Sequence, residues 1–151
     1  NFHEENSHVI PGLIRRFHDS KLQEKDEVQI WGTGEPKREF LHVDDMARGC
    51  IKLMNIDSEV FYKDEDLFSH INLGTGKDIE IKKLANIISK AVNFKGKISF
   101  DTSKPDGTPR KVLNVDKAHS LGWKSTIELE EGIESTYKWF LDNQQLYRGN
   151  K

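Results

Sequence analysis

Trp31-Gly-Thr-Gly-Glu-Pro-Lys-Arg-Glu-Phe-Leu-His-Val-Asp-Asp45 contains the sharpest change of pattern in this sequence. Before it, Val28 and Ile30 alternate with polar residues, which predicts a short half-buried strand. The glycines and the proline inside the stretch predict a tight turn. After the turn the side chains alternate again, which predicts a second strand with Arg38 and Phe40 on the same face. These residues therefore predict two short strands joined by a tight connection.

Arg38 would be held on a stiff element by this second strand. Its guanidinium is always charged, and its planar set of five N–H donors matches carboxylate or phosphate oxygens. Most exposed arginines, however, are solvated or form a surface ion pair of small energetic value. From this stretch alone, an anion-binding role and a plain surface role both remain open.

Composition limits the classes of function. The chain has 151 residues, which fits one domain or a domain fragment with its own core. Its 23 basic and 25 acidic residues give a net charge of −2, so neither nucleic acid nor a membrane is expected as a partner. The chain opens at Asn1 without a signal-peptide or transmembrane pattern, so we expect a cytoplasmic protein and a piece of a longer chain.

Cysteine usage excludes some chemistry. Cys50 is the one cysteine, so the chain has no internal disulfide and no metal site built from several cysteines, and no metal is expected. Cys50 shares helical apolar spacing with Met46, Ala47 and Met54. This spacing predicts that the thiol is buried in the core.

Apolar residues that recur every three to four positions predict helices, and short alternating runs predict strands. The predicted helices cover residues 10–20, 43–54, 81–92, 116–122 and 129–140, with Asp116 as the candidate cap of the fourth. The predicted strands cover residues 28–31, 37–41, 71–73 and 97–100. Helices that alternate with short strands indicate an α/β class, here an α+β-like small domain. The strands are too few and too short for a complete doubly wound sheet, so we expect a larger partner domain.

The polar side of the first predicted helix is a candidate wall of an anion site. Four residues on this side fall at helical spacing, namely His8, Gly12, Arg15 and Arg16. A solvated helix face with an incidental histidine is the alternative. Because Pro11 restricts the residue before it, His8 could instead lie just outside the helix, at its mouth.

Gly74-Thr75-Gly76 follows a predicted strand and precedes a helix, an order that can cradle phosphate. The third glycine of the dinucleotide fingerprint is absent and no P-loop lysine follows, so we interpret this segment as a tight turn. The acidic pair Asp44-Asp45 begins the helix 43–54, where negative charge suits the helix dipole. We therefore interpret the pair as capping rather than catalytic.

Residues 101–111 form a polar loop that is made rigid by its turn residues, which are Pro105, Asp106-Gly107 and Pro109. Its cations are Lys104, Arg110 and Lys111. Rigid loops often carry binding groups, but charged loop residues are also often only solvated. Both interpretations remain open from the loop alone.

Four motifs in order carry a resemblance to a known family. They are Asn6-Ser-His-Val-Ile-Pro11, the stretch from Trp31 to Asp45, Ile71-Asn-Leu-Gly-Thr-Gly76 and Lys104-Pro-Asp-Gly-Thr-Pro-Arg-Lys111. Together they closely resemble the GDP-L-fucose synthases, which are extended short-chain dehydrogenase/reductases. The two inner motifs are shared widely among extended reductases, whereas the first and last are more particular to this family.

The resemblance implies a division of the protein and a reaction. Residues 1–151 would form a C-terminal substrate-binding domain that lacks the Rossmann domain, and NADP(H) would bind mainly to that absent N-terminal domain. The family epimerises GDP-4-keto-6-deoxy-D-mannose at C3 and C5 and reduces the 4-keto group with NADPH to give GDP-L-fucose. The complete enzyme would be a cytoplasmic homodimer.

The piece alone is expected to be inactive, because the family's Gly-rich fingerprint, reductase Ser and Tyr-x-x-x-Lys, and base Cys would all lie upstream of Asn1. The match of Tyr147 and Lys151 to Tyr-x-x-x-Lys is interpreted as chance, since no cofactor fold precedes it. Two alternatives remain. The chain could be the substrate domain of another nucleotide-sugar epimerase or dehydratase, or a stand-alone nucleotide-sugar binding module.

The family's site residues can be carried over by motif. His8 resembles the acid that supplies a proton during epimerisation. The residues that resemble contacts to the GDP-sugar are Asn6, Val9, Leu13, Arg16, Trp31, Arg38 and Lys111. This set is physically coherent, because guanidinium and ammonium groups suit a diphosphate and an indole offers apolar area with one N–H donor.

Overall fold

The computed structural model describes residues 1–3, 6–62 and 70–146, so Tyr147 and Lys151 lie outside the described residues. The helices are α1 Val9–Leu22, α2 Val43–Met54, α3 Ser58–Phe61, α4 Ile81–Val92, α5 Asp116–Ser120 and α6 Leu129–Asp142. The strands are β1 Glu27–Trp31, β2 Lys37–Glu39, β3 Asp78–Glu80, β4 Lys97–Asp101 and β5 Arg110–Lys111. The mixed α/β class predicted from the sequence is confirmed. None of the helices in these ranges is long and apolar enough to cross a lipid bilayer.

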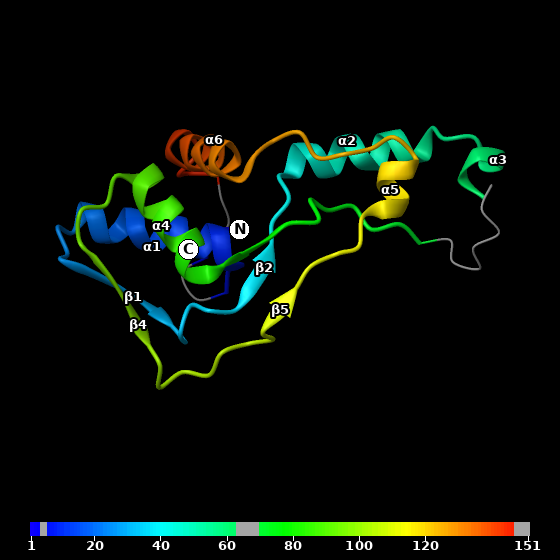
Figure 1. The fold of residues 1–151 in the computed structure, drawn as a ribbon. Helices are drawn as coiled ribbons and strands as arrows, with labels where there is room; N and C mark the ends of the chain where they lie inside the picture. Colours follow the sequence, from blue (N-terminus) through cyan, green and yellow to red (C-terminus); the bar gives the residue numbers. More distant parts are fainter. Residues whose placement is uncertain (4–5, 63–69, 147–151) are drawn as a thin grey trace.

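The strands form two small sheets. β1 and β4 pair in parallel over their full length, from Glu27 opposite Lys97 to Trp31 opposite Asp101. In the second sheet β2 lies between β3, to which it is antiparallel, and β5, to which it is parallel. Figure 1 shows β1, β4, α1, α4 and α6 gathered at one end of the molecule, with α2, α3 and α5 at the other.

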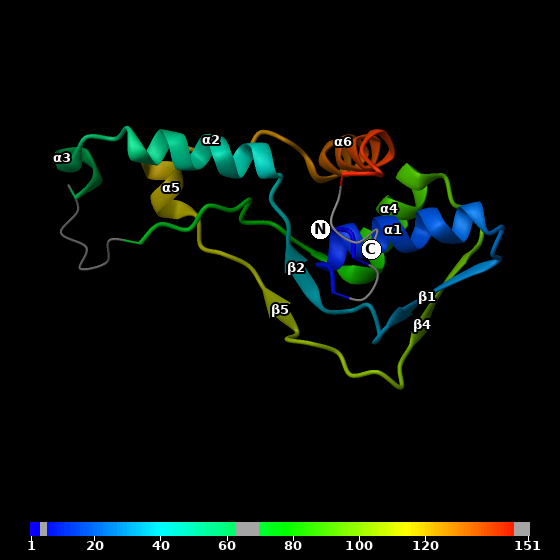
Figure 2. The same cartoon turned by 180° about the vertical axis from the view of Figure 1, so that it is seen from behind.

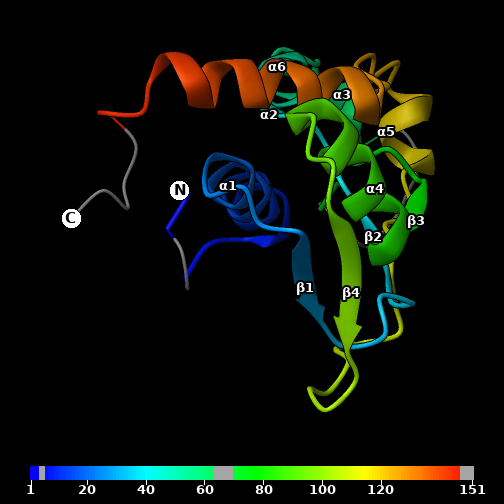
Figure 3. The same ribbon diagram turned by 90° about the vertical axis from the view of Figure 1, so that its left-hand side faces the viewer.

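The core lies where α1, α4 and α6 meet the β1–β4 pair (Figure 3). Its members recur at the predicted spacing on each element; among them are Leu13, Ile14, Phe17, Val28, Ile30, Leu84, Ile88, Ile133 and Phe140. Burying one such side chain contributes about 1.5–3 kcal/mol. α4 ends where Asn93 takes the left-handed conformation with φ of 59°, a common helix stop. The predicted helices at 10–20, 81–92 and 129–140 are therefore confirmed.

Two local predictions are wrong. Residues 71–73 form no strand in the described part of the chain; the side-chain amide of Asn72 instead donates to the carbonyl of Asn114 at 3.0 Å. The antiparallel partner of β2 is β3, which begins at Asp78, six residues after Asn72. Asp116 begins α5 but does not cap it, because Val115 is the N-cap and the Asn114 side chain accepts from the Asp116 N–H at 2.9 Å.

Helix α2 has the predicted amphipathic pattern, but its apolar face is exposed. Figures 1 and 2 show α2 along the outer edge of the molecule with α5 on its inner side. Val43 is 71% exposed and Met54 is 85% exposed, and Cys50 is exposed as well. The prediction that Cys50 is buried is wrong, because helical spacing identifies an apolar face without showing what covers it.

Asp45 is the buried residue of the acidic pair at the start of α2, with only 1% of its surface exposed. Its carboxylate accepts from the backbone N–H groups of Thr126 and Ile127, at 3.0 and 2.9 Å, and from Arg48 at 2.8 Å. It thus fastens α2 to the segment that leads into α6. The N-cap of α2 is His42, whose Nδ1 accepts from the Asp44 N–H at 3.2 Å. The pair is structural, but Asp45 acts between segments rather than as a cap.

Candidate functional site

A cavity of about 310 Å³ lies between the start of α1, the turn after β1 and the loop between β4 and β5. Its lining residues are Ser7, His8, Val9, Gly12, Leu13, Arg16, Ile30, Trp31, Gly34, Pro36, Arg38, Ile81, Pro105, Asp106 and Gly107. Three segments that are far apart in the sequence therefore meet here. Its volume falls at the lower end of the range for small-molecule sites, and its mixed polar and apolar lining is typical of them.

The start of α1 supplies one wall. His8 is the N-cap, so it stands at the mouth of the helix, as the second alternative from the sequence proposed. Its backbone carbonyl accepts from the Gly12 N–H at 2.9 Å, and its side chain makes no capping hydrogen bond. The imidazole is exposed beside the unpaired N–H groups of a first helical turn, which favour negative charge.

Arg16 lies farther along the same face, whereas Arg15 points elsewhere. Arg16 donates to the backbone carbonyl of Gln29 at 3.0 Å, which fixes its guanidinium across to β1. Arg15 donates to Asp19 at 3.3 Å and to the carbonyl of Phe2 at 3.0 Å and does not line the cavity. Of the two arginines at helical spacing, Arg16 is thus the cavity residue.

The turn and β2 supply the aromatic and the second guanidinium group. Trp31 is 67% exposed at the end of β1, so one face of its indole is open to a ligand. The Nζ atom of Lys104 lies 5.8 Å from the centre of this ring, within the range of a cation–π contact. Arg38 projects from β2 and donates to the carbonyl of Lys37 at 2.7 Å.

The structure brings six of the predicted site residues together and leaves two apart. The six that line the cavity are His8, Val9, Leu13, Arg16, Trp31 and Arg38. Asn6 is held beside the N-terminus, where its N–H donates to Nδ1 of His3 at 3.1 Å. Lys111 lines a neighbouring hollow of about 260 Å³, which Arg38 also borders. Lys111 is therefore adjacent to the cavity, and Asn6 is not part of its lining.

Sequence reasoning treated Asp106 as a turn residue and missed its place in the cavity. Its carboxylate accepts from the Thr33 hydroxyl at 2.7 Å and from the Thr33 N–H at 2.9 Å. These hydrogen bonds, with the one from the hydroxyl foremost, lower the pKa of Asp106. The signal was an Asp-Gly pair in a turn, which predicts a local bend but not a partner 73 residues away.

The Gly74-Thr75-Gly76 turn already holds a carboxylate of this chain. Oε1 of Glu39 accepts from the N–H groups of Thr75 and Gly76, the latter at 2.8 Å, and Oε2 accepts from the Leu113 N–H at 2.7 Å. The N–H groups that could cradle a phosphate are therefore occupied, as the tight-turn interpretation requires.

Neither Gly-x-Gly turn of the described residues offers a dinucleotide site. A dinucleotide site needs free backbone N–H groups in a Gly-rich turn before a helix. In the described ranges, the Gly-x-Gly turn that precedes α4 binds Glu39, and the one after β1 binds Asp106 through Thr33. Among the same residues, no group of three or more His, Cys, Asp or Glu side chains is arranged to hold a metal ion.

A Ser, His and Asp group near α6 lacks the hydrogen-bond directions of a hydrolase triad. Nε2 of His42 lies 3.3 Å from the Ser135 hydroxyl. Because Nδ1 of His42 accepts from the Asp44 N–H, the ring proton is on Nε2 and is donated toward Ser135. The Ser135 hydroxyl in turn donates to the carbonyl of Gly132 at 3.0 Å. The ring cannot act as the base for this hydroxyl, so the group is structural.

Known proteins resemble this chain over nearly its whole length. The model of the NAD dependent epimerase/dehydratase family matches residues 1–74. The GDP-L-fucose synthase of Escherichia coli (strain K12) is 54% identical over 150 residues, which is 99% of this chain and 47% of that protein. The chain is a homologue of the GDP-L-fucose synthases. The resemblance drawn from the four motifs is therefore confirmed.

Solved structures agree with this assignment. A GDP-L-fucose synthetase from Naegleria fowleri has a TM-score of 0.85 and 32% identity, over 98% of this chain and 44% of that chain. The same enzyme bound to NADP has a TM-score of 0.81 and 31% identity, over 98% and 44%. The chain thus shares the fold of part of these enzymes, one of which was solved with NADP bound. It spans about half the length of the GDP-L-fucose synthases it matches.

Proposed function

We propose that this chain binds the GDP-sugar in an enzyme that converts GDP-4-keto-6-deoxy-D-mannose to GDP-L-fucose, by epimerisation at C3 and C5 and NADPH-dependent reduction of the 4-keto group. The observation that supports this most is the convergence of Arg16, Arg38 and Trp31 around one cavity. His8, the N-cap of α1, lines the same cavity. Two guanidinium groups suit a diphosphate, and an open indole face suits a base or sugar.

Lys111 extends this cationic group beyond the cavity. Its Cα is paired with that of Arg38 across β2 and β5, and both side chains border the neighbouring hollow. A diphosphate held by Arg38 would therefore lie near a second cation. Asn6 stands outside the cavity in this chain, and its contact to the substrate depends on how the ligand extends toward the N-terminus.

His8 is the proposed acid of the epimerisation. Inverting a carbon next to a ketone requires a base to remove a proton from one face and an acid to return one to the other. Histidine holds a transferable proton near neutral pH, and a bound diphosphate beside His8 would favour its charged form. The base, the reductase residues and the NADP(H) site are assigned to the part of the enzyme outside this chain.

We further propose that residues 1–151 are the C-terminal substrate-binding domain and that the NADP(H)-binding half covers the exposed face of α2. A contiguous exposed apolar face marks a contact surface. Met46 on this face also borders the hollow of Arg38 and Lys111, so the surface is continuous with the proposed site. With that half missing, the chain alone is expected to be inactive. The complete enzyme would be a homodimer.

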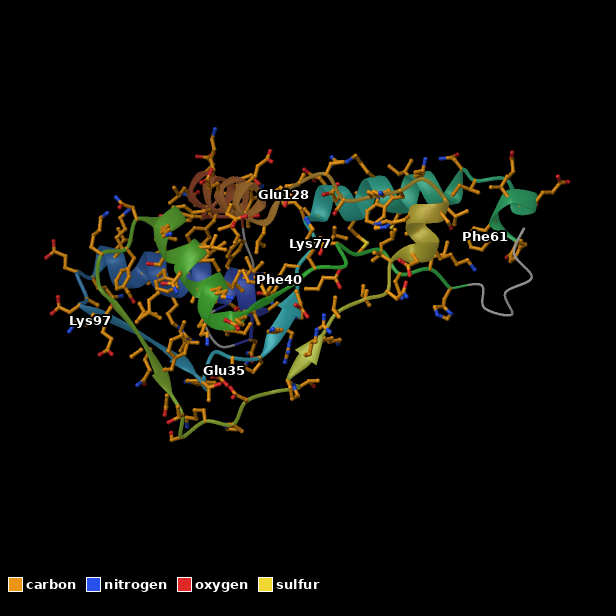
Figure 4. All side chains as sticks on the ribbon, viewed as in Figure 1. Glu35, Phe40, Phe61, Lys77, Lys97 and Glu128 are labelled. Carbon is orange, nitrogen blue, oxygen red and sulfur yellow. The ribbon has the colours of Figure 1, made fainter. Side chains whose placement is uncertain are left out.

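Calorimetry with GDP at low salt tests the proposal. The chain should bind GDP weakly and prefer it to UDP, and Arg38→Ala should weaken binding at least tenfold, or about 1.4 kcal/mol. Lys97→Ala is a matched control, because it also removes one positive charge. Lys97 lies at the start of β4, far from the turn after β1 that carries Glu35 (Figure 4). No binding by the unmodified chain would contradict the proposal, and equal affinities for UDP and GDP would favour another nucleotide-sugar enzyme.

A further inference from the structure

Two hydrogen bonds between Thr33 and Asp106, which we call the Thr33–Asp106 clasp, join two loops that border the cavity. The Thr33 hydroxyl donates to one carboxylate oxygen at 2.7 Å and the Thr33 N–H donates to the other at 2.9 Å. Both groups are exposed, so the bonds add little to the stability of the fold. Their effect is therefore on where the two loops lie.

The backbone of the first loop is built to let the clasp form. Gly32 has φ of +82°, and a Cβ atom there would lie 2.2 Å from a carboxylate oxygen of Asp106. Gly34 has φ of +74°, and its Cβ would lie 2.4 Å from the ring of Phe100. Only glycine tolerates both the conformation and the contact. The Gly-Thr-Gly sequence thus brings the Thr33 N–H and hydroxyl directly against Asp106.

The second loop is anchored at its two ends by other bonds. At its start the Ser103 N–H donates to the Asp101 carboxylate at 3.0 Å, and at its end the Lys37 N–H donates to the carbonyl of Pro109 at 2.8 Å. The clasp holds the middle, where Asp106 lies. Removing the clasp would leave both ends attached and free the segment between them.

That middle segment is a wall of the cavity. Pro105, Asp106 and Gly107 all line it, and a Cβ on Gly107 would lie 3.1 Å from Nη2 of Arg38. The wall therefore packs against the guanidinium assigned to the diphosphate. Among the described residues, Asp106 supplies the one carboxylate that lines the cavity. The clasp engages both oxygens of this carboxylate.

We propose that Thr33 and Asp106 are positioning residues that hold the 105–107 wall against Arg38 and so set the affinity of the cavity for a nucleoside diphosphate. This rests on the proposed function, because the ligand is its GDP group. A wall that is already ordered does not have to be ordered when the ligand binds, and pre-ordering of this kind is a main source of affinity. A freed Asp106 would also repel the diphosphate.

The test compares Thr33→Val, which keeps the shape and the N–H but removes the hydroxyl, with Thr33→Ser, which keeps the hydroxyl. Calorimetry with GDP should show about tenfold weaker binding for Thr33→Val, equivalent to about 1.4 kcal/mol. Thr33→Ser should bind within about twofold of the unmodified chain. Melting temperatures should agree, because exposed bonds contribute little to stability. Ser103→Ala is the control for a bond within the second loop.

Hydrogen exchange provides a readout that does not depend on GDP. Amides of residues 104–108 should exchange faster in Thr33→Val and at the unmodified rate in Thr33→Ser. Unchanged exchange in Thr33→Val, or normal GDP affinity with faster exchange, would overturn the positioning role. Equal weakening by Thr33→Ser would also overturn it. Failure of the unmodified chain to bind GDP would instead reject the proposed function, while the exchange result would still decide whether the clasp orders the wall.

Discussion

Replacing Asp45 by Asn should destabilise the fold even though the shape of the side chain hardly changes. Oδ2 of Asp45 accepts from the Ile127 N–H at 2.9 Å, while Oδ1 accepts from Arg48 at 2.8 Å and from the Thr126 hydroxyl at 3.0 Å. An amide NH₂ group placed at either oxygen position faces a donor. Each orientation of the substituted amide therefore loses at least one hydrogen bond that the buried carboxylate accepts.

The size of the effect follows from these contacts. A hydrogen bond to a charged group contributes about 1.5–3 kcal/mol, so we expect a loss of about 2 kcal/mol in the free energy of unfolding. For a chain of this length that corresponds to a fall of about 4–8 °C in Tm. Asp44→Asn is the matched control, because the neighbouring carboxylate is 66% exposed and should change the free energy by less than about 0.5 kcal/mol.

Urea unfolding followed by tryptophan fluorescence measures the difference. Trp123 is buried against α2 at Gly49, one turn from Asp45, and reports on this contact. Burial alone would raise the pKa of Asp45, but the bonds from Ile127, Arg48 and Thr126 outweigh burial and lower it.

The pH dependence gives a second test of the same reasoning. A lowered folded-state pKa stabilises the fold at pH values above the unfolded pKa of about 3.9, and this contribution disappears as the pH falls through the folded-state pKa. The unmodified chain and Asp45→Asn should therefore converge in stability at low pH. An equal difference at pH 7 and below the folded-state pKa, or no difference at pH 7, would refute the argument.

Two further predictions concern the other internal contacts. Burial lowers the pKa of His18 from 6.5, so the contribution of this residue to stability should be full above that pH and should decrease as the pH falls toward the folded-state pKa. Urea midpoints measured from pH 8 to 5 should show this decrease. In His18→Phe, the part of the decrease that comes from His18 should be absent. Glu39→Gln should lower the free energy of unfolding by about 1–2 kcal/mol, because an amide cannot accept from the Gly76 and Leu113 N–H groups at once. Glu35→Gln, on the exposed turn, should change it by less than about 0.5 kcal/mol, and equal losses in both variants would count against this role of Glu39.

The sequence predicts well those elements whose burial is decided by their own spacing. Leu84 and Ile88 recur one turn apart on α4 and are fully buried, and Val28 and Ile30 alternate on β1 and face the same core. As a set, the six cavity residues were assigned through motifs of a known family, because physical reasoning had offered only His8, Arg16 and Arg38 among them as candidates for an anion site. Physical reasoning from Arg38 alone left an ordinary surface role open.

The features that the sequence missed depend on partners far along the chain or outside it. The spacing of α2 is as regular as that of α4, yet Met54 and Cys50 are exposed because nothing in the described part of this chain covers them. Segment 71–73 has the composition of a strand but no strand beside it among the described residues. Asp106 has an unremarkable turn sequence, and its role appears only when Thr33 is brought next to it.

The two Gly-Thr-Gly turns have a consequence for the order in which this chain folds. Each turn is completed by a carboxylate far away in sequence, 36 residues from Thr75 and 73 residues from Thr33. Contacts between distant residues form slowly, because a long loop must close before they contribute any stabilisation. α1 and α4, by contrast, can begin from local contacts. Both turns are therefore expected to close only after these helices have begun to form, and the cavity wall that Thr33 holds takes shape with the first of them.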